Sequence, residues 1–398
     1  MTARILFVSP YTLFDTTNGA AISMRMLLQT LARNGFECSA LTGTFSPLAG
    51  DIFALPRLQS PPSQHSHYKT RLTRKIKIKQ FDVLSFVHQG MDLNVIDLAG
   101  EFSHLVFQEL AIKSILPTII RKKQPRMLLI SGRISALPSI VTVAERCGIP
   151  VAVYLATARE PADATILSKL QHVLVPSCFL ARYYQDRYGI HCSVLRPIIE
   201  DPATKFPHSA RFVTMVNPAP EKGVTMFYGI AKEALRSLPS VRFQVVEGRW
   251  TKAELIRSGL NLCALPNVAV VPNAKYLAPA LSRTSILIHP SYWEEAFGRT
   301  IVEAQSWGIP VLASRRGGIP EALNGGGFLF DIPDRLISGY MRMPSRAAVK
   351  PWLNQLTILL SDTRARRVAS NVARRAAAEL TANSKRDAVK LFSLLVKT

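Results

Sequence analysis

The sequence predicts an α/β protein built from two Rossmann-like domains with parallel sheets. In the first half, the apolar run at residues 4–8 is followed by apolar residues at helical spacing over 21–32 and then by a β-like run at 38–42. Gly35 supplies a stop between the helix and the second strand. The same order recurs along the chain, and alternation of this kind builds a parallel sheet covered by helices.

Further short apolar runs, each followed by helix-compatible sequence, extend the pattern through both halves. They lie at residues 127–130, 151–155, 172–176, 211–216, 241–246, 268–271, 286–289 and 310–313. At 398 residues the chain exceeds one ordinary core, since a domain takes roughly 150 residues.

The junction between the two domains is predicted at residues 197–207, a polar stretch with three prolines. We therefore expect an N-terminal domain at 1–200 and a C-terminal domain at 201–398. The tail from about residue 344 is helical and rich in Arg and Ala, and we expect it to pack on the second domain. Facing sheets of this type leave a cleft at the carboxyl ends of their strands, where ligands bind.

Composition and charge limit the classes of partner. Hydrophobic residues make up 48% and charged residues 19%, which excludes global disorder, while a net charge of +22 attracts anions. The sequence lacks the aromatic, zinc-finger and helix-turn-helix patterns of nucleic-acid binders, so nucleic acid is not an expected partner. Basic clusters at 69–79 and 121–126 favour an anionic membrane surface, with an ordinary solvated basic face as the alternative.

Cysteine usage and hydropathy bear on localisation. No apolar run approaches roughly 18 residues, and the first residues lead into a strand without a signal-peptide pattern. The five cysteines are scattered and lack any CxxC pair, which favours free thiols over a zinc site. These features predict a cytoplasmic protein, soluble or peripheral at the inner membrane face.

Two glutamates carry the sharpest chemical signal. Glu295 and Glu303 are separated by seven residues, in a stretch where Gly298 opens a helix and Gly308 closes it before another strand. Glu295 is therefore expected on a loop at the carboxyl end of a strand, and Glu303 inside the following helix. The free amides at that helix start suit a pyrophosphate, and an ionised carboxylate such as Glu303 suits a ribose diol.

This stretch resembles the E-x7-E motif of the retaining glycosyltransferase family four, glycosyl transferases group 1, which has the two-domain GT-B fold. Other segments resemble family landmarks in the same order over roughly residues 3 to 331. They are NGAA at 18–21, VLVPSCFLARYY at 173–184, PEKG at 220–223 and GGIPE at 317–321.

The resemblance implies that the domain at 1–200 binds the acceptor and that the domain at 201–398 binds the nucleotide sugar. It also implies roles for individual residues of a donor site. Glu303 would bind the ribose, Glu295 a hydroxyl of the transferred sugar, and Lys222 the diphosphate, with Glu295 and Lys222 the catalytic pair. A fixed lysine and a helix N-terminus stabilise a departing diphosphate more than they stabilise the ground state. The remaining donor-binding residues are Gly19, Asn217, Asn273, Ala296, Phe297, Gly298, Arg299, Thr300 and Ile301, where residues 297–301 act through their amides.

Cofactors are not expected, because the sequence has no carboxylate pair of the DxD type to hold a metal and the family is similarly metal-independent. The donor would be a nucleoside diphosphate sugar and the acceptor a glycan, a lipid-linked sugar or a small molecule. The resemblance also implies transfer of a hexosyl-type group with retention of configuration.

Three departures from the family pattern bear on activity. Asn217 stands where the family usually has an arginine, Asn18 replaces the first glycine of the N-terminal loop, and Ala156 replaces a histidine that contacts the donor sugar. Arg159 or Arg299 is a candidate to restore the positive charge.

The departures leave a second reading open, a catalytically silent GT-B protein that binds a nucleotide sugar or a partner enzyme. A third reading, a nucleotide-sugar epimerase, lacks the additional acid/base carboxylate and histidine that it needs in the first domain.

Overall fold

The computed structural model describes residues 3–16, 18–45, 70–98, 104–132, 134–200, 209–273 and 277–396. The chain divides into two compact units, Met1–Ile198 with Ser384–Thr398, and Ile199–Asn383. The first cut falls at the start of the proline-containing stretch, whose residues 201–208 lie outside the described residues.

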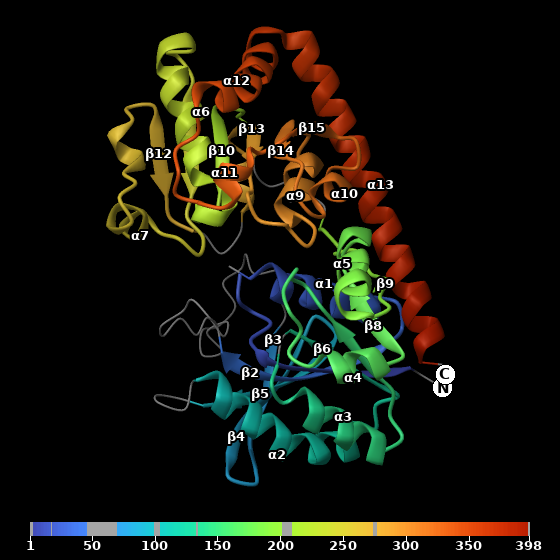
Figure 1. Cartoon of the computed structure of the whole chain (residues 1–398). Coiled ribbons are helices and arrows are strands. Elements are labelled where there is room, and N and C mark those ends of the chain that lie inside the picture. The colour runs from blue at the N-terminus through green and yellow to red at the C-terminus, as the bar shows by residue number, and fades with distance from the viewer. Residues whose placement is uncertain are drawn as a thin grey trace. The chain divides into compact units, whose positions relative to one another are not determined.

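The first unit is a nine-stranded sheet with helices on both faces (Figure 1). The strands run in the order β3-β4-β5-β2-β1-β6-β7-β8-β9. Its elements are β1 (Arg4–Tyr11), α1 (Gly19–Arg33), β2 (Glu37–Phe45), β3 (Thr70–Ile78), β4 (Phe81–His88), β5 (Met91–Asp97), α2 (Leu105–Lys123), β6 (Met127–Ser131), α3 (Leu137–Arg146), β7 (Val151–Tyr154), α4 (Ala164–Lys169), β8 (His172–Val175), α5 (Cys178–Tyr188) and β9 (Ser193–Val194).

Strand β1 lies in the middle of this sheet because it is apolar on both faces. Its residues 5–8 are all buried, and the side chains of Ile5 and Phe7 pack in one core with α1. Helices α2 and α3 lie on the side of the sheet opposite α1 (Figure 1). The two helical layers explain why the parallel strands appear in the sequence as continuous apolar runs.

The predicted parallel arrangement holds for most of the first sheet, and one edge of this sheet adds antiparallel strands. Strands β3, β4 and β5 form an antiparallel meander, of which β5 pairs with β2 in parallel. The predicted basic cluster at 69–79 is largely strand β3, which is the edge strand of the sheet. Exposed Lys75 and Lys77 on an edge strand discourage pairing with another chain, which gives these cations a structural purpose. Lys69 itself lies outside the described residues.

The second unit is a six-stranded, wholly parallel sheet in the order β12-β11-β10-β13-β14-β15. Every strand predicted in this half is confirmed within two residues, and β15 was not predicted. Its elements are β10 (Phe212–Val216), the 3-10 turn η2 (Pro220–Lys222), α6 (Val224–Ser237), β11 (Arg242–Val246), α7 (Lys252–Arg257), η3 (Leu262–Ala264), β12 (Val268–Val271), α8 (Ala278–Leu281), β13 (Thr284–His289), α9 (Arg299–Ser306), β14 (Val311–Ser314), α10 (Ile319–Leu323), β15 (Gly327–Phe330), α11 (Asp334–Ile337), α12 (Arg346–Ser361) and α13 (Thr363–Leu395).

The tail is helical as predicted, but it does not all belong to the second unit. Helix α12 packs on α6, with Trp352 buried against Phe330 at 4.5 Å between ring centroids. The last turns of α13, from Ser384 onward, belong to the first unit, where Phe392 and Leu395 join the core that contains Ile5. The expectation that the whole tail packs on the second domain is therefore wrong, because these apolar residues are buried in the other core.

Candidate functional site

The strand order of the second sheet reverses between β10 and β13. From β10 the chain moves outward through β11 and β12, then returns to pair β13 against the other side of β10. The segments that follow β10 and β13 therefore diverge from two adjacent strand ends. Ligands of open α/β sheets bind at the carboxyl ends of such a pair, so this point is where a site is expected.

Lys222 lies in the tight turn η2 that follows β10. Gly223 ends the turn at φ +79, and a Cβ built there would lie 1.9 Å from the carbonyl oxygen of Pro290. Only glycine allows this approach. The carbonyl oxygen of Glu221 accepts hydrogen bonds from the amides of Tyr292 and Trp293, at 2.9 and 3.0 Å. These contacts fix the turn to the loop that follows β13.

Glu295 lies on that loop, as the sequence predicts. The amide of Gly318 donates a hydrogen bond of 2.7 Å to the carbonyl oxygen of Glu295, and the Ser314 hydroxyl donates to the Ser291 carbonyl at 2.6 Å. A Cβ on Gly317, whose φ is +56, would lie 2.4 Å from the Glu295 oxygen. The GGIPE segment thus supports the glutamate loop through close backbone contact.

Lys222 and Glu295 meet in an ion pair whose side chains are 24% and 12% exposed. His289, the last residue of β13, brings Nε2 to 3.5 Å from the same carboxylate oxygen. Burial alone raises the pKa of Glu295, but the charge of Lys222 and the contact with His289 lower it, and the pKa lies well below its ordinary range. Glu295 is therefore ionised at neutral pH and positioned by two basic groups.

Helix α9 begins directly after this loop and carries the second glutamate. Gly298 is its N-cap at φ +122, and Glu303 lies in its middle, as predicted. A guanidinium nitrogen of Arg299 lies 3.2 Å from a carboxylate oxygen of Glu303. Of the amides predicted to meet the donor, that of Ile301 already donates to the Gly298 carbonyl oxygen at 3.0 Å.

The other amides of this segment stand at the start of the helix, where a first turn leaves its N–H groups without intrahelical acceptors. Their side chains differ in burial: Phe297 packs in the core at 3% exposure, whereas Ala296 and Thr300 are partly exposed. Phe297 therefore anchors the loop, and its side chain is not presented to a ligand.

Asn217 has a structural role that was not predicted from the sequence. Its φ is +59, and its amide oxygen accepts a hydrogen bond of 3.0 Å from the backbone of Arg249, on the loop after β11. The exposed side chain of Arg249 thus projects from the neighbouring strand end, a place where a cation was not predicted. Asn273 is exposed just after the edge strand β12. The rest of the predicted base-contacting loop, from Ala274, lies outside the described residues.

Two residues predicted for the donor site, Gly19 and Arg159, belong to the first unit. Gly19 is the first residue of α1, and the side chain of Asn18 caps this helix by accepting a hydrogen bond of 3.0 Å from Ala20. A glycine could not supply this cap, which accounts for asparagine at position 18. Exposed Arg159 sits on a loop held by the Tyr184 hydroxyl, which donates toward the carbonyl oxygens of Thr157 and Arg159.

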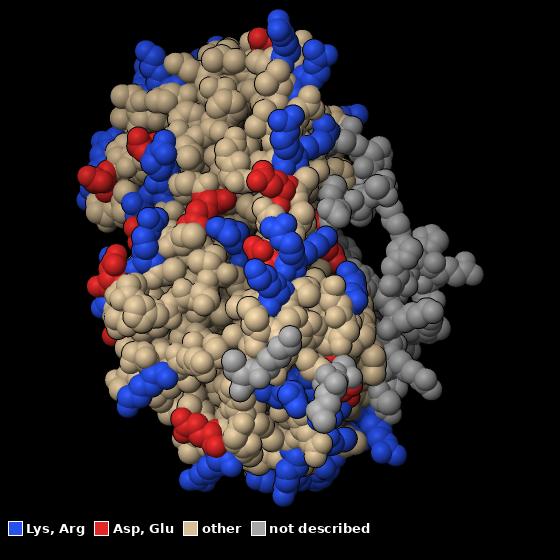
Figure 2. Space-filling view, turned by 90° about the vertical axis from the view of Figure 1, so that its right-hand side faces the viewer, with Lys and Arg blue, Asp and Glu red and all other residues tan. Residues whose placement is uncertain are grey.

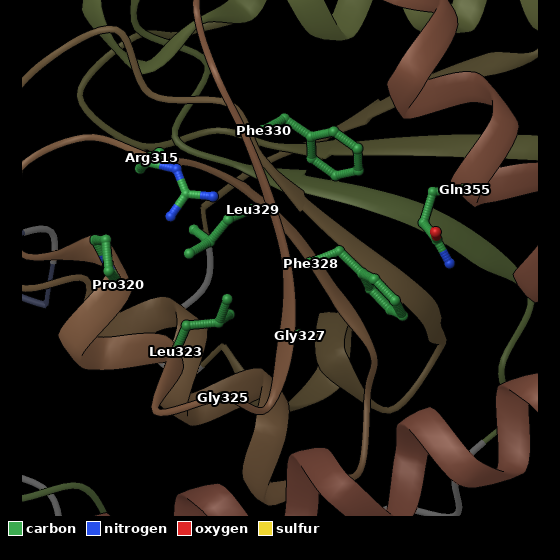
Figure 3. Close-up of a pocket in the computed structure, with 9 residues that line it drawn as sticks. All are labelled: Arg315, Pro320, Leu323, Gly325, Gly327, Phe328, Leu329, Phe330 and Gln355. Atoms are coloured by element: carbon green, nitrogen blue, oxygen red, sulfur yellow. The ribbon is translucent and has the colours of Figure 1, made fainter.

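Within the described part of the chain, no group of three or more His, Cys, Asp and Glu side chains is arranged to hold a metal ion. A cavity of about 380 Å³ lies beside β15, its lining does not include Lys222 or Glu295, and Figure 3 shows Phe328, Phe330 and Gln355 around it. None of the predicted donor residues lines this cavity. The candidate donor site is therefore identified by the contacts between its side chains and not by a cavity.

Part of the chain matches a known protein family in sequence. Residues 209–343, about a third of the chain, match the sequence profile of the family described as Glycosyl transferases group 1. The matched segment contains Lys222, Glu295 and Glu303. No curated protein matches the sequence.

Solved structures match over almost the whole chain. A glycosyltransferase from Rickettsia africae is similar at 15% identity and a TM-score of 0.69, over 100% of this chain and 99% of that one. Anabaena HepE, solved with UDP and glucose, is similar at 15% identity and a TM-score of 0.65, over 98% and 99%. WaaG, a glycosyltransferase involved in lipopolysaccharide biosynthesis, is similar at 13% identity and a TM-score of 0.60, over 96% and 98%. The predicted fold is confirmed: the chain has the GT-B fold of glycosyltransferases.

None of the five cysteines forms a disulfide bond, as predicted, and Cys38 is buried. Among the described residues, none of the helices has the length and apolar character needed to cross a bilayer.

Proposed function

We propose that the protein is a retaining glycosyltransferase that moves a hexosyl group from a nucleoside diphosphate sugar to an acceptor. The observation that carries this proposal is the partly buried ion pair of Lys222 with Glu295 at the strand-order reversal, directly before the N-terminus of α9. The match of residues 209–343 to the glycosyl transferase profile supports it.

In this proposal the diphosphate lies at the start of α9, where free amides and the positive end of the helix dipole attract an anion. Lys222 then turns its ammonium from Glu295 toward the diphosphate, and Glu295 accepts a hydroxyl of the sugar. Glu303 accepts the ribose hydroxyls, which requires it to exchange its contact with Arg299 for the ligand. Lys222 neutralises the charge that builds on the leaving group, so it acts in the transition state more than in the ground state.

We also propose that the reaction needs no metal and takes place in the cytoplasm, on a glycan, a lipid-linked sugar or a small molecule. One ammonium and one helix N-terminus supply the positive charge that a divalent cation supplies elsewhere. UDP sugars are the first donors to test, because HepE, whose structure is similar to that of this chain, was solved with UDP.

The test has two stages, binding and turnover. Thermal unfolding with UDP, GDP, ADP and TDP identifies the base, since a ligand at 100 times its Kd adds about 2.7 kcal/mol. Release of nucleotide from the matching sugar donors then measures transfer or hydrolysis, with and without EDTA. Binding without turnover across acceptors would replace the enzyme by the catalytically silent protein, and failure of every nucleotide to bind would overturn the proposal.

A further inference from the structure

His289 carries a buried ring nitrogen that forms no hydrogen bond with the residues that the structure describes. Its Nε2 atom is closed off from solvent and lies 3.5 Å from a carboxylate oxygen of Glu295, within the range of an ion pair but without the geometry of a hydrogen bond. The side chain as a whole is 13% exposed. Most buried polar atoms have a hydrogen-bond partner, so a buried nitrogen without one calls for a physical reason.

The carboxylate oxygen that His289 approaches is also the one that Lys222 contacts, and Lys222 makes the closer contact. Two basic groups therefore share a single acceptor atom. Nε2 is the nitrogen that carries a proton when it faces this oxygen, because an unprotonated ring nitrogen would direct its lone pair at a carboxylate. His289 is thus a hydrogen-bond donor held beside an acceptor that Lys222 already uses.

The three groups differ in their freedom to move. His289 ends strand β13 and is paired with Ala313 of β14, so its backbone is fixed in the sheet. The backbone of Glu295 is held by the amide of Gly318 at 2.7 Å. Lys222 reaches the site on a flexible stem of four carbons, and its side chain is the most exposed of the three at 24%. The ammonium is therefore the group that can leave, while the carboxylate and the imidazole stay.

This inference rests on the proposed function, in which a diphosphate at the start of α9 attracts Lys222 away from Glu295. Glu295, at 12% exposure, is then a carboxylate with little access to water, and a buried charge without a partner is costly. We propose that His289 is a positioning residue, whose Nε2 donates a hydrogen bond to Glu295 once Lys222 has turned to the diphosphate. It acts through Glu295, which it keeps paired and in place for the sugar hydroxyl.

A purely structural histidine at the end of β13 would also be buried. It would stabilise the fold, but its effect on nucleotide binding would not depend on the charge of residue 295. In the proposed role, the effect of His289 exists only while residue 295 is a carboxylate. A double-mutant cycle measures this dependence directly.

Positive charge elsewhere on the protein does not disturb this measurement. Lys and Arg side chains are spread over the face drawn in Figure 2 and outnumber Asp and Glu there. Such a surface attracts any polyanion in every variant. Its contribution to affinity therefore cancels when the four members of the cycle are compared.

The experiment measures the affinities of the full chain for UDP, GDP, ADP and TDP by isothermal titration calorimetry. The cycle comprises the native chain, His289→Leu, Glu295→Gln and the chain with both changes. His289→Gln keeps an N–H donor of similar reach and tests rescue by a conservative change. His191→Leu, at an exposed histidine of the first unit, is the matched control. Urea denaturation checks the folding of every variant.

For the nucleotide that the native chain binds best, His289→Leu should weaken binding roughly tenfold or more, as expected from losing a hydrogen bond to a charged group. In the Glu295→Gln background the same change should weaken binding less than about twofold, which is the margin within which independent effects add. His289→Gln should restore most of the affinity, and His191→Leu should bind like the native chain.

Equal losses from His289→Leu in the two backgrounds would overturn the proposal and make His289 a structural residue. An affinity of His289→Leu equal to that of the native chain would overturn it as well. Both outcomes leave the proposed function intact, because the native chain binds the nucleotide in each case. If the native chain bound none of the four nucleotides, the proposed function would fail and the role of His289 would fail with it.

Discussion

The carbonyl oxygen of Glu221 accepts a hydrogen bond of 2.9 Å from the amide of Tyr292. This bond joins the turn after β10 to the loop after β13, so the lysine of one and the glutamate of the other meet before any ligand arrives. Positions fixed by backbone contacts need little rearrangement on binding, which favours tight recognition of a charged ligand. Four predictions test how this site is built and used.

Replacing Lys222 by Met should weaken binding of the nucleoside diphosphate by roughly 10- to 100-fold, as expected from losing a charged hydrogen bond of about 1.5–3 kcal/mol. Isothermal titration calorimetry with the nucleotide identified by thermal unfolding measures the loss. Lys232→Met, an exposed lysine on α6, is the matched control and should bind normally. Equal affinities of the Lys222→Met variant and the native chain would remove Lys222 from the diphosphate site.

Glu295→Gln should lower stability at pH 7 by about 1–3 kcal/mol, because Lys222 and His289 lose a partly buried, charged partner. The folded-state pKa of Glu295 is depressed, so its contribution is complete above the unfolded-state pKa and is lost as the pH falls toward the folded-state value. The difference between the native chain and the variant should therefore narrow as the pH falls below about 4.5.

Urea denaturation midpoints from pH 7 down to pH 3 measure this difference. Glu294→Gln, whose carboxylate lies 3.6 Å from Arg316 and is more exposed, is the matched control. A difference that stayed constant over the whole range would mean that the charge of Glu295 does not contribute.

Arg249→Gln should weaken nucleotide binding by roughly fivefold and reduce its salt dependence. The backbone bond from Arg249 to Asn217 holds this cation at the strand end beside the one that leads to Lys222. Titrations at two salt concentrations compare it with Arg257→Gln, an exposed arginine on α7. If the two variants had the same nucleotide affinity and the same salt dependence, Arg249 would be only a surface cation with no specific role in binding.

Gly317→Ala should destabilise the second unit and weaken nucleotide binding. An alanine Cβ would meet the Glu295 carbonyl oxygen at 2.4 Å, in addition to the strain of φ +56. Gly325→Ala is the matched control, since its φ is +72 but nothing lies within 4 Å of the added Cβ. Backbone strain alone is about 1–2 kcal/mol, so a larger loss in Gly317→Ala measures the contact. Equal losses would show that the glycine serves only the backbone.

Part of this site could be predicted because the patterns that mark it involve residues close together in the sequence. Apolar runs predicted the strands of the parallel sheets, and Gly298 and Gly308 marked the limits of α9. These features placed Glu295 on a loop and Glu303 on a helix, where the structure has them. The helical character of the tail is confirmed for the same reason, because helical spacing is a local pattern.

Other features depend on residues that are distant in the sequence. His289 contacts Glu295 only because β13 ends beside the turn of Lys222, and its one sequence signal is its place at the end of an apolar run. The meander of β3 to β5 was missed because an edge strand rich in lysine looks like a charge cluster. The last turns of α13 were misplaced because a helical pattern gives the face that is buried but not the core that buries it.

By itself, then, the sequence determined five of the six strands of the second sheet, the division into two domains near residue 200, and the positions of Glu295 on a loop and Glu303 on a helix, since propensity and spacing act over a few residues. Only the tertiary structure decided that Lys222, His289 and Glu295 converge and that Asn217 positions Arg249. Burial and ion pairing depend on which strand ends become neighbours, and that choice is made by the sheet as a whole.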